Sequence, residues 1–141
     1  MTVDQTGAVL ELLPLSAAAS LRPGPTLAAV DPDVTLGEQM LAAARSAGLV
    51  QPEPIADFAI DELDAESLLD RVPRPMSRGE RQLCALLVTL AAPVEALVVV
   101  DPTAGLDGRR RRTVADILID LAADRPVAIA SDDAAFDEHR R

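Results

Sequence analysis

The chain has 141 residues, enough for one domain with a hydrophobic core of its own. Its formal net charge of −10 disfavours nucleic acid and anionic membrane surfaces as partners, because their phosphate groups repel the protein. One Cys, one His and no Lys exclude an internal disulfide, a Cys-based metal site and a catalytic triad. No metal is therefore expected. A composition rich in Ala, Arg and Pro indicates a GC-rich, bacterial genome.

The sequence also predicts where the protein acts. Its longest apolar run, residues 83–94, is too short to cross a bilayer. The N-terminus lacks the basic segment of a secretory leader. We therefore expect a cytoplasmic protein without direct membrane insertion.

The first third of the chain predicts two strands and a helix. Residues 7–13 and residues 26–30 are short apolar runs that predict strands. Between them, Arg22-Pro23-Gly24-Pro25 predicts a turn after a linker of small residues. Residues 35–48 predict a helix, because Thr at its start is followed three residues later by Glu and the pattern ends in Gly.

The middle of the chain is less regular. Residues 51–62 contain two prolines and four acids, which fits either a solvated connection or a short helix. Residues 64–71 predict a short helix that ends before two prolines. Ser77 and Glu80 then form a capping-box pattern at the start of an apolar helix that runs to about Ala92.

The last third alternates strand and helix. Residues 94–100 are a continuous β-branched run, typical of a strand buried on both faces. A loop at 101–108, a helix over 109–123 and a strand over 127–130 follow, and residues 134–141 form an acidic tail with two terminal Arg. Strands alternating with helices predict an α/β fold with a parallel sheet.

One segment carries a motif with chemical content. Met76-Ser77-Arg78-Gly79-Glu80 begins the long helix, and Asp101-Pro102-Thr103-Ala104-Gly105-Leu106-Asp107 follows the strand after it. This order resembles the second half of an ABC-type ATPase domain. That family has a Ser-Gly signature, a helix, an apolar strand ending in acids and a Pro-Thr-x-Gly-Leu-Asp loop. The resemblance covers about residues 6–133 and is densest over 76–107.

The resemblance implies a fold and a division of the chain. It implies an α/β fold with a small parallel sheet of the P-loop ATPase type and a helical subdomain, lacking the P-loop strand and helix. The chain is then a single domain. Its α/β core consists of residues 6–35 and 94–133, and its helical subdomain with the signature helix consists of residues 36–92. The tail is residues 134–141.

The resemblance also implies an order of strands. Strands 26–30, 94–100 and 127–130 are expected side by side in that order. This order leaves an open apolar edge on 127–130, a template for aggregation. We expect a second copy, a partner chain or a rearranged segment such as 7–13 to cover that edge.

The residues that hold and cleave ATP in the resembled family are depleted here. The Gly-rich phosphate loop with its Lys is missing. Of the two acids at the strand end, only one remains, whether Asp101 takes the place of the first or of the second. Asp132 or Ser131 stands at the position of the switch His. We expect a pseudo-ATPase that does not hydrolyse ATP alone and binds no cofactor alone, with ATP and Mg²⁺ only in the presence of a partner.

The signature acts on a partner's nucleotide in the resembled family. Ser77, Gly79 and the start of the following helix would present donors to a phosphate held by another domain. Arg78 replaces a Gly of the family, and it either adds charge or crowds the nucleotide. Glu80 replaces a Gln. The capping box has a structural role in either case.

The remaining site residues have structural alternatives. Asp101 is either a turn-former before Pro102 or a metal ligand of a degenerate Walker B strand. Asp107 either caps the next helix or makes an inter-domain contact of the D-loop. Arg109 to Arg112 form either a solvated face or a site for an acidic partner or phosphate. Cys84 reads as a small buried hydrophobe.

Three functions follow from these observations. The first is an accessory or regulatory partner of a complete ABC ATPase domain or an ABC transporter permease, at the membrane only through that transporter. The second is an interaction protein that has lost nucleotide binding altogether, and the third is one half of a split ATPase. Self-association is compatible with each of them.

Overall fold

The computed structural model describes residues 2–3, 9–21 and 24–140, and it divides into two compact units. The α/β unit consists of Met1–Thr26 and Glu95–Arg141, and the helical unit consists of Leu27–Val94. Among the described residues, none of the helices has the length and apolar character that a membrane crossing requires. The expected division into one core, one subdomain and a tail stays a prediction.

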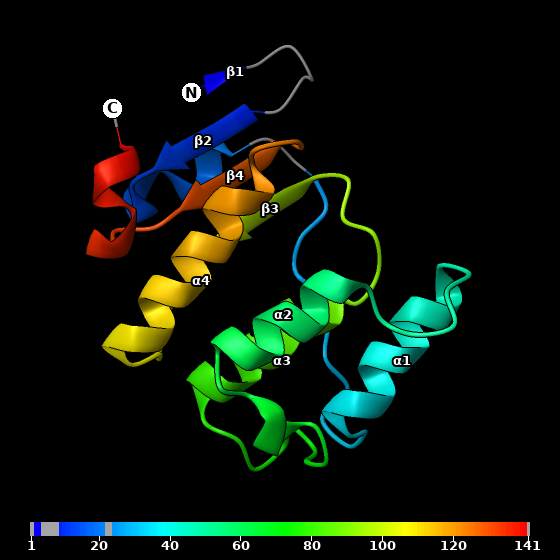
Figure 1. Cartoon of the computed structure of the whole chain (residues 1–141). Helices are drawn as coiled ribbons and strands as arrows, with labels where there is room; N and C mark the ends of the chain where they lie inside the picture. Colours follow the sequence, from blue (N-terminus) through cyan, green and yellow to red (C-terminus); the bar gives the residue numbers. More distant parts are fainter. Residues whose placement is uncertain (1, 4–8, 22–23, 141) are drawn as a thin grey trace. The chain divides into compact units, whose positions relative to one another are not determined.

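A four-stranded sheet organises the α/β unit (Figure 1). Its strands are β1 (Thr2–Val3), β2 (Val9–Leu13), β3 (Leu97–Val100) and β4 (Val127–Ala130), in the order β1-β2-β4-β3. β2, β4 and β3 are parallel, and β1 is antiparallel to β2. The prediction of an α/β fold with a small parallel sheet is thus confirmed.

β2 pairs with the edge of β4 that the expected strand order leaves without a neighbour. Leu10 lies opposite Val127 and Leu13 opposite Ala130. The Ser131 N–H extends the ladder by donating a 2.9 Å hydrogen bond to the Leu13 carbonyl. A rearranged N-terminal segment therefore fills this position, as one of the expected alternatives has it, although residues 7 and 8 of that segment lie outside the described residues.

The prediction of a strand at Thr26 to Val30 is wrong. Pro25 offers its carbonyl to the N–H of Val98 at 2.7 Å, and the ladder ends there. Two residues further on, the Ala28 N–H donates instead to the hydroxyl of Thr89 at 2.8 Å. The segment is extended and apolar, but Pro25 bonds to a strand whereas Ala28 bonds to a helix side chain. The segment therefore does not pair with β3 as a strand. The first position in the expected order of strands is therefore wrong, whereas β3 and β4 are neighbours as expected. The predicted turn at Arg22-Pro23 lies outside the described residues.

Short helices and one long helix complete the α/β unit. η1 (Leu15–Ser20) occupies the expected linker, and α4 (Gly108–Leu121) matches the helix expected after the loop. The expected tail contains η3 (Ala134–His139), because Phe136 is fully buried and anchors it. An isolated aromatic side chain among acids gave no periodic signal for this element.

The helical unit is built around α3 (Arg78–Leu90), which packs against α1 (Leu36–Ser46) and α2 (Pro54–Glu62). α2 decides the alternative left open for residues 51–62 in favour of a helix. Residues 64–71 contain only η2 (Glu66–Leu68), so the helix predicted there is shorter than expected.

Local signals fix the ends of these helices. Thr35 caps α1, and Gly48 follows its end with a φ of +83°, a conformation that glycine adopts without strain. Cys84 in α3 is fully buried beside Met76, with 3.5 Å between the two sulfur atoms. Burial raises the pKa of the Cys84 thiol to about 11. The residue is therefore a small hydrophobe, as predicted.

Candidate functional site

The signature residues form the first turn of α3. The Ser77 hydroxyl accepts the Glu80 N–H at 3.1 Å, and the Glu80 carboxylate accepts the Ser77 N–H at 3.1 Å. This reciprocal pair is the capping box that the sequence predicts. The turn is fixed by its own side chains before any ligand is considered.

The same turn keeps hydrogen-bond donors for a ligand. The N–H groups of Arg78 and Gly79 stand at positions where an α-helix offers no internal acceptor. Ser77 and Arg78 are exposed, whereas Gly79 is buried. The guanidinium of Arg71 lies 3.4 Å from the Glu80 carboxylate and offsets part of its negative charge. The arrangement can present donors and one cation to an anion.

Asp101 ends β3 in the α/β unit. Its φ is +51°, a left-handed conformation in which Asp is one of the few tolerated side chains. Its N–H donates to the Ala130 carbonyl at 2.8 Å, and its own carbonyl accepts the Ala104 N–H at 3.2 Å. These bonds make Asp101 a turn-former at the end of the strand. A metal at its carboxylate stays a prediction.

Asp107 caps α4. Its carboxylate accepts the Arg110 N–H at 2.9 Å, and the Arg111 N–H donates to its carbonyl at 2.9 Å. The capping alternative considered for this residue is therefore realised, and an inter-domain contact stays a prediction. Arg109, Arg111 and Arg112 follow on the exposed side of the helix.

Asp132, at the predicted switch position, follows β4. Its carboxylate accepts the Leu15 N–H at 2.9 Å and so holds the start of η1. Because β3 and β4 are parallel neighbours, Asp101 and Asp132 follow their carboxyl ends at the same edge of the sheet. The structure brings these two predicted residues together. Ser77 to Glu80 belong to the helical unit, and their predicted role stays a prediction.

One cluster in the α/β unit was missed in the sequence. The Thr103 hydroxyl donates a 2.6 Å hydrogen bond to Asp133 Oδ2, and Arg111 Nε lies 3.9 Å from the same oxygen. The other oxygen, Oδ1, accepts the Ala135 N–H at 2.9 Å and so caps η3. Asp133 adjoins Asp132 in the sequence, but nothing local identifies a partner 30 residues away.

These contacts determine the charge of Asp133. Burial by itself raises the pKa of this carboxyl, whereas the hydrogen bonds from Thr103 and Ala135 lower it. The positive charges of Arg111 and Arg140 act in the same direction. The pKa of Asp133 therefore lies below its ordinary value.

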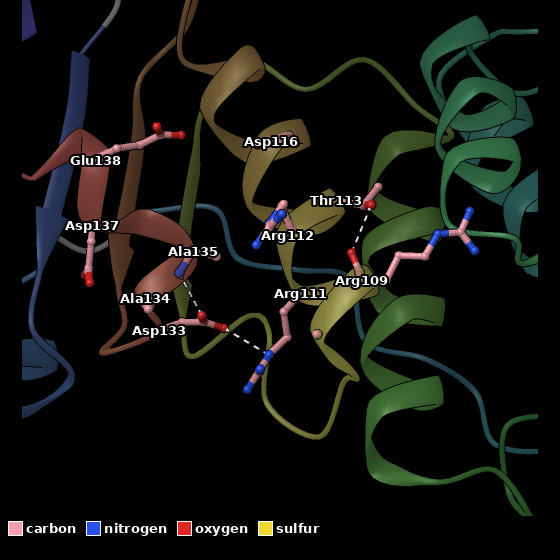
Figure 2. A pocket seen from close by; sticks show the side chains of 11 residues that line it. Arg109, Arg111, Arg112, Thr113, Asp116, Asp133, Ala134, Ala135, Asp137 and Glu138 are labelled. Atoms are coloured by element: carbon pink, nitrogen blue, oxygen red, sulfur yellow. Dashed lines mark hydrogen bonds and ion pairs between the residues drawn. The ribbon is translucent and has the colours of Figure 1, made fainter.

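An open pocket of about 920 Å³ lies beside this cluster (Figure 2). α4 supplies one wall with Arg109, Arg111 and Arg112, and η3 supplies the other with Asp137 and Glu138. Positively and negatively charged side chains therefore line the same pocket. Among the described residues, no group of three or more His, Cys, Asp or Glu side chains is placed to hold a metal ion.

Curated relatives of the chain match part of its length. EcfA2 of Bacillus subtilis, an energy-coupling factor transporter ATP-binding protein, is 42% identical over 57 residues, which are 40% of this chain and 21% of that protein. A putative ABC transporter ATP-binding protein of Streptomyces avermitilis is 35% identical over 89 residues, 62% of this chain and 34% of that protein. The chain thus spans about a fifth to a third of these relatives. No protein-family model matches the sequence.

Solved structures extend the likeness to nearly the whole chain. A dimeric ATP-binding cassette in a post-hydrolysis state, bound to ADP and Pi, gives a TM-score of 0.67 at 13% identity, over 94% of this chain and 78% of that one. A putative ABC transporter ATP-binding protein from Pyrococcus furiosus gives 0.64 at 15% identity, over 93% and 80%. At these identities the likeness shows the fold alone. The homologues and structural neighbours of this chain are ATP-binding domains of ABC transporters, and the chain has part of that fold.

Proposed function

We propose that the chain is an accessory or regulatory partner of a complete ABC ATPase domain or an ABC transporter, and that it offers its signature turn in trans to ATP held by that partner. The observation that carries the proposal is the first turn of α3. Its Arg78 and Gly79 N–H groups are unused within the helix, and its Ser77 hydroxyl is exposed. Relatives that are ABC ATP-binding proteins support it.

The turn has the chemistry of an anion site. The N-terminal end of a helix carries partial positive charge, and its free N–H groups point toward a bound phosphate. Ser77 keeps its hydroxyl proton as a further donor, since in the capping box its oxygen only accepts. Arg78 adds a full positive charge on an exposed side chain.

In this proposal the chain does not hydrolyse ATP by itself. These 141 residues contain no Lys to contact a γ-phosphate, and the end of β3 offers Val100 and Asp101 where the family has two acids. We expect no turnover by the purified chain. Turnover that survives removal of contaminating ATPases and disappears in Asp101→Asn would contradict this expectation.

Nucleotide-dependent pairing tests the proposal. The chain is mixed with a hydrolysis-deficient variant of a complete ABC ATP-binding protein from the same organism, with and without ATP and Mg²⁺, and complex formation is followed by sedimentation. Ser77→Asp keeps the cap but places a carboxylate at the phosphate, so we expect pairing to weaken at least about tenfold. Thr35→Asp makes the same change at the cap of α1 and is the matched control.

Each outcome of this experiment assigns a function. Equal pairing by wild type and Ser77→Asp removes the trans contact. No pairing with ATP favours an interaction protein that has lost nucleotide binding. Hydrolysis by a mixture with a competent partner favours a split ATPase. The cytoplasmic location, with attachment to the membrane only through a transporter, belongs to this proposal as well.

A further inference from the structure

The chain carries two runs of opposite charge, and each includes exposed side chains on a helix. Residues 46–70 contain seven acids and no basic residue, and α2 lies within this stretch. Residues 109–112 are four consecutive Arg at the start of α4. Each run violates the usual placement of charge on a helix, and neither is used in the proposed function.

The acidic face belongs to α2. Asp57, Phe58, Asp61 and Glu62 follow one another at helical spacing and are all exposed, so they form one stripe. We call this stripe the α2 face. None of its three carboxylates forms an ion pair with a described residue, and Phe58 is 55% exposed in a chain with only two aromatic residues. Asp61 and Glu62 stand in the last turn, where the negative end of the helix dipole opposes them.

The basic face belongs to the first turns of α4. Arg109 and Arg112 are exposed, and neither forms an ion pair within the described part of the chain. In Figure 2 the Arg109 side chain extends away from η3, whereas Arg111 turns toward Asp133. We call Arg109 and Arg112 the α4 face. They stand at the positive end of their helix, which again opposes their charge.

The acids beside the α4 face do not neutralise it. Asp133 pairs with Arg111, Asp137 with Arg140 at 3.1 Å, and Glu138 lies 3.4 Å from His139. Asp116 is the one acid of the pocket without such a pair among the described residues. The two Arg side chains of the α4 face therefore keep an excess of positive charge.

We propose that the α2 face of one copy of this chain docks against the α4 face of a second copy. The carboxylates of Asp61 and Glu62 meet the guanidinium groups of Arg109 and Arg112, and Phe58 offers its ring to one of them. At a rise of roughly 1.5 Å per residue, Phe58 and Asp61 lie roughly 4.5 Å apart along their helix, and Arg109 and Arg112 are separated by the same rise along theirs.

The chemistry favours a second copy over another partner. Both halves of the contact are present in one sequence, and each relieves the misplaced charge of the other, since a negative helix end meets a positive one. Nucleic acid is disfavoured as the partner of the α4 face, because its phosphates are repelled by a chain with a net charge of −10. The contact is heterologous and needs no nucleotide, so it goes beyond the proposed function and fails or holds independently of it.

Sedimentation of the nucleotide-free chain tests the contact over about a hundredfold range of concentration. We expect wild type to associate at about 50 mM salt. Raising the salt to about 500 mM should dissociate it, because the contact is ionic. Arg109→Glu/Arg112→Glu and Asp61→Arg/Glu62→Arg are each expected to be monomeric, since each leaves like charges opposed. Arg45→Glu/Arg81→Glu, which reverses two exposed Arg elsewhere, is expected to associate as wild type does.

Mixing the two monomeric variants gives the decisive result. The unchanged α2 face of the first fits the unchanged α4 face of the second, and the two reversed faces also complement each other. We expect the mixture to associate as wild type does. Both variants move charge to the favourable helix end, so neither should melt below wild type. A monomeric wild type, association of either variant alone, or a mixture that stays monomeric overturns the proposal.

Discussion

The hydroxyl of Thr103 donates a 2.6 Å hydrogen bond to the carboxylate of Asp133. Thr103 is 2% exposed and belongs to the loop after β3, whereas Asp133 caps η3 after β4. A single bond therefore ties together the loops that follow two neighbouring parallel strands. The loop with the predicted D-loop residues and the C-terminal segment depend on each other through it.

Thr103→Val is expected to lower the free energy of unfolding by about 2 kcal/mol, because a hydrogen bond to a charged group is lost in a buried place. Urea unfolding measures the change. Thr113→Val is the matched control, since its hydroxyl bonds only to the Arg109 carbonyl on the same helix. A loss of similar size in both variants would contradict the role given to Asp133.

The stability of the protein should fall in acid partly through Asp133. Its pKa is lowered in the folded protein, so its contribution is complete above the ordinary value of 3.8 and is lost as the pH falls below it. The free energy of unfolding of Asp133→Asn should therefore depend less on pH below that value than the free energy of unfolding of wild type does. Asp116→Asn removes a carboxylate from exposed surface and is the control for the loss of one negative charge. The free energy of unfolding is measured by urea unfolding at a series of pH values. An equal decrease with falling pH in Asp133→Asn and wild type would contradict the prediction.

Ser77→Ala should cost about 1 kcal/mol of stability through the lost cap of α3. Ser77→Asp should cost almost nothing, because Asp caps a helix as well as Ser does. Urea unfolding of both variants checks this result and shows whether the pairing experiment compares folded proteins. Equal destabilisation by Ala and Asp would mean that the capping box does not hold the turn.

The Cys84 thiol should be inert in the folded protein. A pKa of about 11 instead of 9.0 lowers the thiolate fraction about a hundredfold near neutral pH, and burial also blocks the reagent. Labelling by a thiol reagent should accelerate only when denaturant unfolds the helical unit. Rapid labelling without denaturant would show that α3 opens locally.

Leu13→Pro should uncover β4. The backbone of Leu13 faces β4, since its carbonyl accepts the Ser131 N–H, and proline at this position cannot donate to the ladder. We expect faster hydrogen exchange at Ser131 and at the amides of β4. Leu13→Ala keeps the backbone bonds and is the control. In wild type, exchange at these amides should be slow at every protein concentration, and fast exchange would show that the edge is open.

The sequence predicts well what adjacent residues determine. The caps at Thr35, Ser77 and Asp107 depend on side chains within three residues, and the structure has all three. β3 and β4 were predictable because each is a short run of apolar residues, Leu-Val-Val-Val and Val-Ala-Ile-Ala. β3 is shorter than the predicted 94–100, and Val100 at its end is 50% exposed, so burial on both faces holds for only part of the run. In each case the physical cause lies within the segment itself.

Pairing between distant segments was not predictable in the same way. Residues 26–30 have the composition of a strand, but whether they join the sheet depends on the acceptors available to Ala28, which takes Thr89. The bond from Thr103 to Asp133 and the burial of Phe136 likewise depend on the folded core. The resemblance predicted β4 as a neighbour of β3, which the structure confirms, and it was wrong about a strand at 26–30 on the other side of β3.

The pairing of β2 with β4 joins residues that are far apart in the chain, since Leu10 lies opposite Val127. During synthesis β2 can pair with β1 early, but its parallel partner β4 is made only after the helical unit, β3 and α4. The helical unit is one continuous segment, Leu27–Val94, and can form in the meantime. We therefore expect the closure of the sheet to be the slowest step of folding, because it brings together distant segments of the chain.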